Sequence, residues 1–182
     1  MITLPAPLRR IADKLGQSAP AVLATLARLL FAAVLLRYYW ASGLTKIGDG
    51  SLGLLRPGVG AYAQIWPRAM EAAGYDASQL SSFQNLVVLA GTWAEFLLPA
   101  MVVLGLLTRL SALGMIGFIV LQSLTDIYGL GAAPEDIGRW FDRASGALIL
   151  DQRALWVFLL TVLVLRGGGP LSCDRLLFRN AP

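Results

Sequence analysis

Four apolar stretches separated by polar connections constrain the fold of this chain more than any other feature. Residues 21–44 carry only two charges, Arg28 and Arg37, and residues 77–108 carry one, Glu95. A helix needs about 20 apolar residues to cross the hydrocarbon core of a bilayer. We therefore predict an all-α fold, a four-helix transmembrane bundle with spans at about 20–44, 83–107, 110–128 and 151–166.

The predicted fourth span is the shortest of the four. Its uncharged run covers only residues 154–165, and a helix from Asp151 to Arg166 is about 24 Å long at 1.5 Å per residue. That length is short of the roughly 30 Å hydrocarbon core, although charged ends can snorkel to the surface. A short span is the favoured interpretation, and a re-entrant segment is the alternative.

Composition narrows the chemistry that such a chain can perform. Charged residues make up 14% of the sequence and hydrophobic residues 57%, against about 25% and 45–50% in ordinary soluble domains. The chain has no histidine and one cysteine, Cys173, which excludes histidine-ligated metals, histidine-based triads and an internal disulfide. The G-x-G-x-x-G match at residues 48–53 lacks the flanking strand and helix of a nucleotide site. We predict no catalytic residue and no metal site.

Short interfacial helices are expected outside the spans. Residues 1–19 have a basic amphipathic pattern and are predicted to form a surface segment, separate from a membrane domain over 20–182. Ser18 is expected to cap the first span. In the outer connections, the spacing of apolar residues over 62–73 predicts one helix, and Pro134 marks the start of another.

Charge counting gives a topology. With four spans, both termini share a side with the turn at Thr108 and Arg109. That side carries seven basic residues and two acids, whereas the other side carries six basic residues and seven acids. The seven basic residues are Arg9, Arg10, Lys14, Arg109, Arg166, Arg175 and Arg179. The positive-inside rule therefore places both termini in the cytoplasm, and it explains the basic residues better than nucleic-acid binding does.

Polar residues inside the predicted spans are the candidate site. Glu95 lies about 13 Å and Arg37 about 10 Å from the outer ends of their helices, at 1.5 Å per residue. A lone charge in a membrane is costly, so Arg37 is predicted to point inward and pair with Glu95, with Arg28 as the alternative partner. The expected outer cluster comprises Arg37, Lys46, Glu95, Gln122 and Asp126. A proton- or quinone-handling site, a headgroup anchor and a purely structural ion-pair network remain open.

Four short stretches together resemble the DoxX family of small bacterial membrane proteins. They are Arg28–Phe31, Ser42-Gly43-Leu44-Thr45-Lys46, Glu95 with Gly105-Leu106-Leu107-Thr108-Arg109, and Gly169-Pro170-Leu171-Ser172-Cys173-Asp174. Their order and spacing over residues 26–177 carry the resemblance. Cys173 stands where the family usually has leucine, and Arg37 is not part of the family pattern.

The resemblance implies a four-helix bundle in a bacterial inner membrane and gives function only loosely. Relatives are linked to quinone-coupled sulfur oxidation, to membrane oxidoreductase complexes and to stress operons. We expect a non-catalytic membrane subunit that assists a soluble or membrane redox partner, with quinone as the only cofactor that the resemblance suggests. The alternative is a small transporter or lipid- or quinone-binding protein with a path through Arg37, Glu95 and Asp126. Homo-oligomers remain open.

Overall fold

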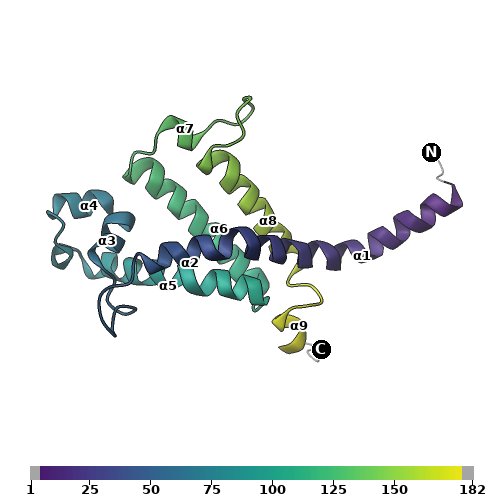
Figure 1. Ribbon diagram of the computed structural model, residues 1–182, viewed down its shortest axis with the longest axis horizontal. Helices are drawn as coiled ribbons and strands as arrows, with labels where there is room; N and C mark the ends of the chain where they lie inside the picture. Colours follow the sequence, from purple (N-terminus) through teal and green to yellow (C-terminus); the bar gives the residue numbers. More distant parts are fainter. Residues whose placement is uncertain (1–4, 178–182) are drawn as a thin grey trace.

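The structure of the protein, a computed structural model, describes residues 5–177 and is all-α over that range (Figure 1). Four of its helices are long and apolar enough to cross a membrane. They run over Ala6–Leu44, Ser82–Leu104, Thr108–Gly129 and Leu148–Arg166. The predicted fold class is confirmed. The last helix has 19 residues, about 28 Å at 1.5 Å per residue, because it begins three residues earlier than predicted.

The long helices form a closed ring. α1 (Ala6–Phe31) packs against α8 (Arg153–Arg166), α8 against α6 (Thr108–Leu124), and α6 against α5 (Ser82–Leu104). α5 closes the ring by contacting the first helix along α1 and α2 (Arg37–Leu44). The buried core between them is apolar and comprises Ala27, Phe31, Leu35, Tyr39, Val102, Ala112, Met115, Ile119, Leu160 and Leu163.

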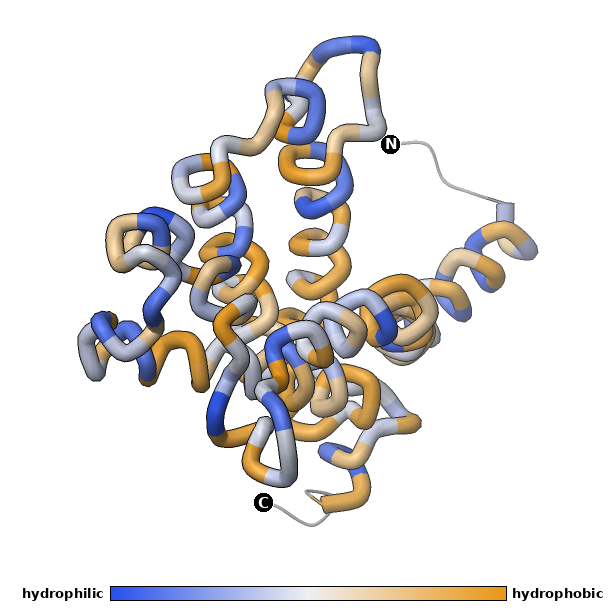
Figure 2. Tube along the Cα trace, turned by 60° about the vertical axis from the view of Figure 1, so that its left-hand side comes forward, coloured by the Kyte–Doolittle hydropathy of each residue, from blue (hydrophilic) through white to orange (hydrophobic). Residues whose placement is uncertain are grey.

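The outer surface of the ring is also apolar. Only 22–28% of the residues in each spanning window are buried inside the structure. Large side chains such as Leu110, Phe158 and Leu165 are each more than 60% exposed. Figure 2 shows that hydrophilic segments gather in the connections, whereas the crossing region of the helices is mainly hydrophobic. An apolar exterior of this extent indicates that the chain is a multi-pass membrane protein.

The first helix is longer than the sequence predicted. α1 begins after Pro5, passes through Pro20, and continues through the π-helical turn η1 (Ala32–Leu36) into α2. The expected cap at Ser18 is wrong, because the Ser18 hydroxyl donates to the Lys14 carbonyl one turn back instead of accepting from a helix start. The N-terminal part of α1 extends beyond the bundle in Figure 1. Its placement on a membrane surface stays a prediction.

The outer connections carry short helices, as expected, but with one break. α3 (Val59–Ile65) and α4 (Pro67–Ala72) replace the single helix predicted over 62–73. Trp66 between them has φ −125° and ψ 58°, since a residue before proline avoids the helical region. The second connection contains α7 (Pro134–Ile137), so the helix start at Pro134 is confirmed. The remaining short elements are η2 (Ala77–Gln79), η3 (Thr125–Gly129), η4 (Leu148–Gln152) and α9 (Cys173–Leu177).

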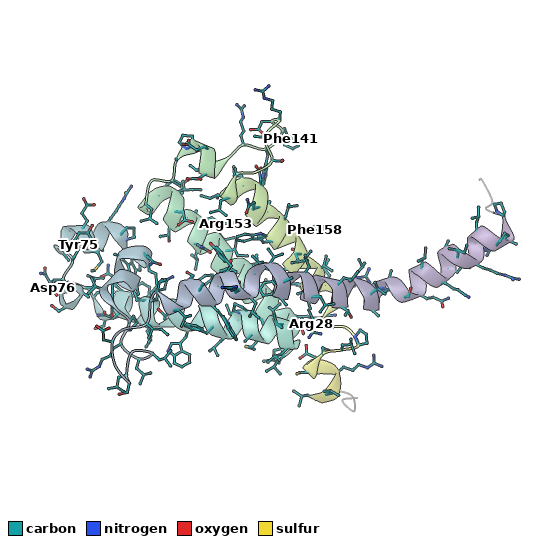
Figure 3. The ribbon with its side chains drawn as sticks, in the orientation of Figure 1. Arg28, Tyr75, Asp76, Phe141, Arg153 and Phe158 are labelled. Atoms are coloured by element: carbon teal, nitrogen blue, oxygen red, sulfur yellow. The ribbon has the colours of Figure 1, made fainter. Side chains whose placement is uncertain are left out.

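Asp76 fixes the entry to η2, outside the spans. Its carboxylate accepts hydrogen bonds from the Ser78 backbone N–H at 2.9 Å and from the Ser78 hydroxyl at 2.7 Å. These bonds favour the charged form and hold the pKa of the Asp76 carboxyl below its usual value. Asp76 therefore has a local role at a turn on the periphery of the molecule, where Figure 3 places it.

Arg28 closes one end of the bundle, which we call the inner end. Its guanidinium donates to the Val102 carbonyl at 3.2 Å and to the Val103 carbonyl, both in the last turn of α5. It also donates to Gly168 O at 2.9 Å and Leu171 O at 2.7 Å in the segment after α8. The last carbonyls of a helix lack intrahelical partners, so one side chain serves α5 and the C-terminal segment together (Figure 3).

Asp174 completes the inner end from the opposite direction. Its carboxylate accepts from Leu107 N at 2.6 Å, Thr108 N at 2.9 Å and Thr108 Oγ1 at 2.6 Å. It caps α6 from a distant part of the chain, because the N-cap residue Leu107 has no side chain that can do so. Gly105 makes this approach feasible: it has φ +67°, and a Cβ there would lie 2.6 Å from Ser172 Cβ. We call Arg28, Gly105, Thr108, Ser172 and Asp174 the inner latch.

Replacement of Arg28 tests the inner latch. Arg28→Met leaves several buried carbonyls without a donor, and hydrogen bonds to charged groups contribute about 1.5–3 kcal/mol each. We expect the free energy of unfolding in detergent to fall by at least about 3 kcal/mol. The matched control is Arg37→Met on the same helix, where the side chain is exposed and removal of an unpaired charge from a span should not lower the free energy of unfolding. Equal losses in the two variants would contradict the latch.

Candidate polar site in the outer half of the bundle

A buried ion pair joins the first helix to α5 on the side opposite the inner latch. Lys46 Nζ lies 3.0 Å from Glu95 Oε1, and each side chain is 5% exposed. The Ser42 hydroxyl bridges the two, since it accepts from Lys46 Nζ at 2.8 Å and donates to Glu95 Oε1 at 3.2 Å. The acid and the base therefore share one neutral hydroxyl as a common partner.

Close helix packing brings these side chains together. Gly43 lies against the ring of Phe96, and a Cβ at residue 43 would lie 2.7 Å from the Phe96 Cζ atom. Trp40 Nε1 donates to the Phe96 carbonyl at 3.2 Å on the same side. A side chain at residue 43 would force either the Phe96 ring or the packing of α2 on α5 to shift. The spacing Gly43-x-x-Lys46 thus combines a contact position with a charge one turn later.

A second ion pair joins α8 to the outer end of α6. Arg153 Nη2 donates to Asp126 Oδ2 at 2.6 Å, and Arg153 Nη1 donates to the Ser123 hydroxyl at 3.0 Å. The Arg153 side chain is 3% exposed, and that of Asp126 is 25% exposed. Figure 3 places Arg153 in the wedge between α6 and α8. The Arg153 guanidinium therefore lies inside the bundle, whereas the Asp126 carboxylate is closer to the surface.

Tyr39 lies on the buried face of the first helix, one turn before Ser42. Its side chain is fully buried and meets the Tyr38 ring edge-on at 5.0 Å and the Phe118 ring at 5.9 Å between centroids. The phenol lies within electrostatic range of both Arg153 and Glu95. On the adjacent face, Gln122 Nε2 donates to the Tyr38 hydroxyl at 3.2 Å. Tyr39 thus lies in an aromatic cluster with Tyr38 and Phe118.

We call this set the outer polar core: Tyr39, Ser42, Lys46, Glu95, Gln122, Asp126 and Arg153. Four of its buried polar atoms have no hydrogen-bond partner among the described residues, namely Tyr39 Oη, Glu95 Oε2, Gln122 Oε1 and Arg153 Nε. A buried polar group without a partner costs about 1–3 kcal/mol, so native proteins keep few of them. The four atoms offer both donors and acceptors, which suits a small molecule that carries carbonyl or hydroxyl groups.

The structure places the predicted site residues differently from the expected cluster. Lys46 and Glu95 are brought together, but the predicted inward pairing of Arg37 with Glu95 is wrong, since Arg37 is exposed. Arg37 is two residues from the buried Leu35 and from the buried Tyr39. At 3.6 residues per turn, two positions correspond to about 200° of rotation, which places Arg37 on the opposite face. The depth of Arg37 along its helix is compatible with an ion pair to Glu95, but the direction of the Arg37 side chain is not.

Arg28 and Asp126 also have different partners from those predicted. Arg28, the alternative partner of Glu95, donates to carbonyls of the inner latch instead. Asp126 pairs with Arg153 rather than with Arg37. Gln122 lies one turn from Asp126 but binds Tyr38.

Sequence reasoning missed Tyr39, Ser42 and Arg153. Arg153 lies within the predicted fourth span but counts among the six basic residues of the outer side, because the uncharged run begins only at residue 154, whereas helix η4–α8 begins at Leu148 and buries Arg153. Tyr39 could have been found, because it lies four residues after Leu35 on the buried face of the first helix.

Comparisons with protein-family models, with curated proteins and with solved structures gave no match to this chain. Within residues 5–177, no group of three or more cysteine, aspartate or glutamate side chains is arranged to hold a metal ion.

A double-mutant cycle tests the Lys46–Glu95 pair. Glu95→Leu strands a buried ammonium group, and removing one partner of a buried pair costs about 3–5 kcal/mol of unfolding free energy. Adding Lys46→Met should recover about 0.5–3 kcal/mol of that loss through the coupling of the two sites. The control cycle pairs Glu95→Leu with Arg37→Met and should show no recovery. Additive losses for Lys46 and Glu95, measured by unfolding in detergent, would refute the pair.

Proposed function

We propose that this protein is a non-catalytic membrane subunit of a quinone-linked redox system and that the outer polar core holds the carbonyl end of a quinone. The observation that carries the proposal is the pair of buried donors, Tyr39 Oη and Arg153 Nε, without partners among the described residues. A quinone carbonyl is an acceptor without a donor of its own. Two buried donors, a phenol hydroxyl and a guanidinium N–H, match that requirement.

The surroundings of these donors suit an aromatic ring that arrives from the membrane. Tyr39 contacts Phe118, and Tyr38 lies 5.4 Å from the Trp156 ring between centroids. Small-molecule sites are mostly apolar and aromatic with a few oriented polar groups, which describes this region. The tail of a membrane quinone would remain among the exposed apolar side chains of the spans. The two ion pairs would supply fixed charges that orient the carbonyl end.

The proposal includes membership of a DoxX-like family. The stretches that carry the resemblance contact one another in the structure, which supports it: Gly43 and Lys46 meet the helix turn of Glu95 and Phe96, and Arg28 meets Gly105. Asp174 caps Thr108 at the same inner end. The residues that carry the resemblance therefore lie at contacts that hold the bundle together. A soluble or membrane redox partner would supply the electrons.

The alternative of a small transporter requires a path through Arg37, Glu95 and Asp126. Arg37 is exposed on the outer surface of the first helix, so it does not line an interior path with the two acids. The described geometry favours the binding function over transport. Within the same proposal, the protein lies in a bacterial inner membrane with both termini in the cytoplasm.

Reporter fusions test the topology. Alkaline phosphatase joined to the C-terminus should be inactive, because the enzyme needs the oxidising periplasm to form its disulfides. A fusion after Gly58, in the connection between the first two spans, should be active. A cytoplasm-dependent fluorescent reporter at the same two positions should give the opposite pattern. Active alkaline phosphatase at the C-terminus would overturn the assigned orientation.

Quinone binding is tested by titrating the purified protein with a short-chain ubiquinone and following tryptophan fluorescence. Tyr39→Phe removes one donor and should weaken binding about tenfold, which corresponds to about 1.4 kcal/mol. The same change removes an unpartnered buried hydroxyl, so stability should be unchanged or higher.

Tyr128→Phe is the matched control, since Tyr128 is 66% exposed at the end of the third span. It should bind the quinone like the unmodified protein. Unaltered affinity in Tyr39→Phe, or no binding by the unmodified protein, would refute the quinone site.

A further inference from the structure

A second polar region lies at the inner end, outside the outer polar core. A cavity of about 540 Å³ opens between the start of α6, the end of α8 and the segment that leads to α9. Its basic residues come from three different elements: Arg109 from α6, Arg166 from α8 and Arg175 from α9. All three side chains are exposed. The cavity is therefore a basic pocket that several chain segments build together.

The positive charge of this pocket is not neutralised within the described part of the chain. The two ion pairs found over residues 5–177 are Lys46–Glu95 and Arg153–Asp126, and neither involves these arginines. Among residues 5–177, the only acid that lines the pocket is Asp174. Both of its oxygens accept hydrogen bonds from Leu107 and Thr108, so it is committed to capping α6. The pocket thus has three arginine side chains and one carboxylate, and that carboxylate is already hydrogen-bonded to the start of α6.

The pocket also has an apolar side. Leu107 is 42% exposed and Leu110 is 66% exposed, and both line the cavity beside Arg109. The third span begins at Thr108 and the fourth ends at Arg166, so the pocket lies at the level where two spans meet the membrane surface. A ligand that fills it would contact arginine side chains on one side and leucine side chains on the other.

We propose that this pocket binds the phosphate headgroup of an anionic phospholipid, independently of the quinone site. The arginines can donate several hydrogen bonds to phosphate oxygens, and guanidinium geometry favours such pairing. Basic pockets between the ends of membrane helices are suited to anionic lipid headgroups. The exposed leucines would meet the start of the acyl chains, a contact that free phosphate cannot make. Lipid rather than soluble phosphate is therefore the occupant.

Native mass spectrometry of the protein in detergent, titrated with phosphatidylglycerol or phosphatidylcholine, tests this assignment. We expect phosphatidylglycerol to remain bound and phosphatidylcholine to dissociate. Each basic residue at a membrane surface contributes about fivefold in affinity for anionic lipid, so Arg166→Gln with Arg175→Gln should lose about 25-fold. Neither side chain donates a hydrogen bond within residues 5–177, so this double variant should keep its melting temperature.

The matched control is Arg56→Gln with Arg68→Gln, two exposed arginines in the outer connection. It should retain phosphatidylglycerol like the unmodified protein. Equal loss in both double variants, no loss in Arg166→Gln with Arg175→Gln, or equal retention of phosphatidylcholine would overturn the proposal. Displacement of phosphatidylglycerol by equimolar inorganic phosphate would overturn the choice of lipid. These outcomes do not depend on quinone binding.

Discussion

A buried guanidinium group in a membrane protein has to find acceptors, and the position of Arg28 among backbone carbonyls is the interaction on which this bundle depends. The Arg28 guanidinium donates to carbonyls at the end of α5 and in the segment after α8, so it joins the first, second and fourth spans at one point. Asp174 then caps α6, the remaining span, through Leu107 and Thr108. Helix ends buried without water need such partners, because lipid supplies none. All four spans are therefore joined at this end of the structure.

Buried polar groups are hydrogen-bonded to different extents at the two ends of the bundle. At the inner latch, Arg28 donates to backbone carbonyls, and Asp174 accepts from backbone N–H groups and from the Thr108 hydroxyl, so these hydrogen bonds fix helix ends. In the outer polar core, Tyr39 Oη and Arg153 Nε are buried without partners among residues 5–177. A region that serves only to hold helices together has no need for unpaired donors, which carry a free-energy cost. This contrast supports the proposed quinone site in the outer polar core, whereas the hydrogen bonds of Arg28 and Asp174 fix helix ends.

Much of the fold could be predicted from the sequence, because apolar length and the glycine-containing turn at 105 give four helices and their order. The partners of the charged residues could not be predicted. The position of a residue along a helix gives its depth, but it does not give the direction in which the side chain points around the helix axis. Arg37 and Glu95 match in depth, yet Arg37 lies about 200° away from the buried face, whereas Lys46 lies on it. Arg153 falls within the predicted fourth span, but its burial against Asp126 could not be predicted, because a π-helical turn before α8 lengthens the last span beyond its apolar run. Long-range capping by Asp174 also leaves no local pattern in the sequence.

The central claim is that the interior beside Tyr39 accepts a quinone carbonyl, and photo-crosslinking with an azido-quinone in native membranes tests it most directly. Peptide mapping by mass spectrometry should place the label on the segments that surround the outer polar core, residues 37–46 and 118–126, with competition by unlabelled quinone. Label confined to exposed lipid-facing side chains such as Leu155 and Phe158, without competition, would contradict the account.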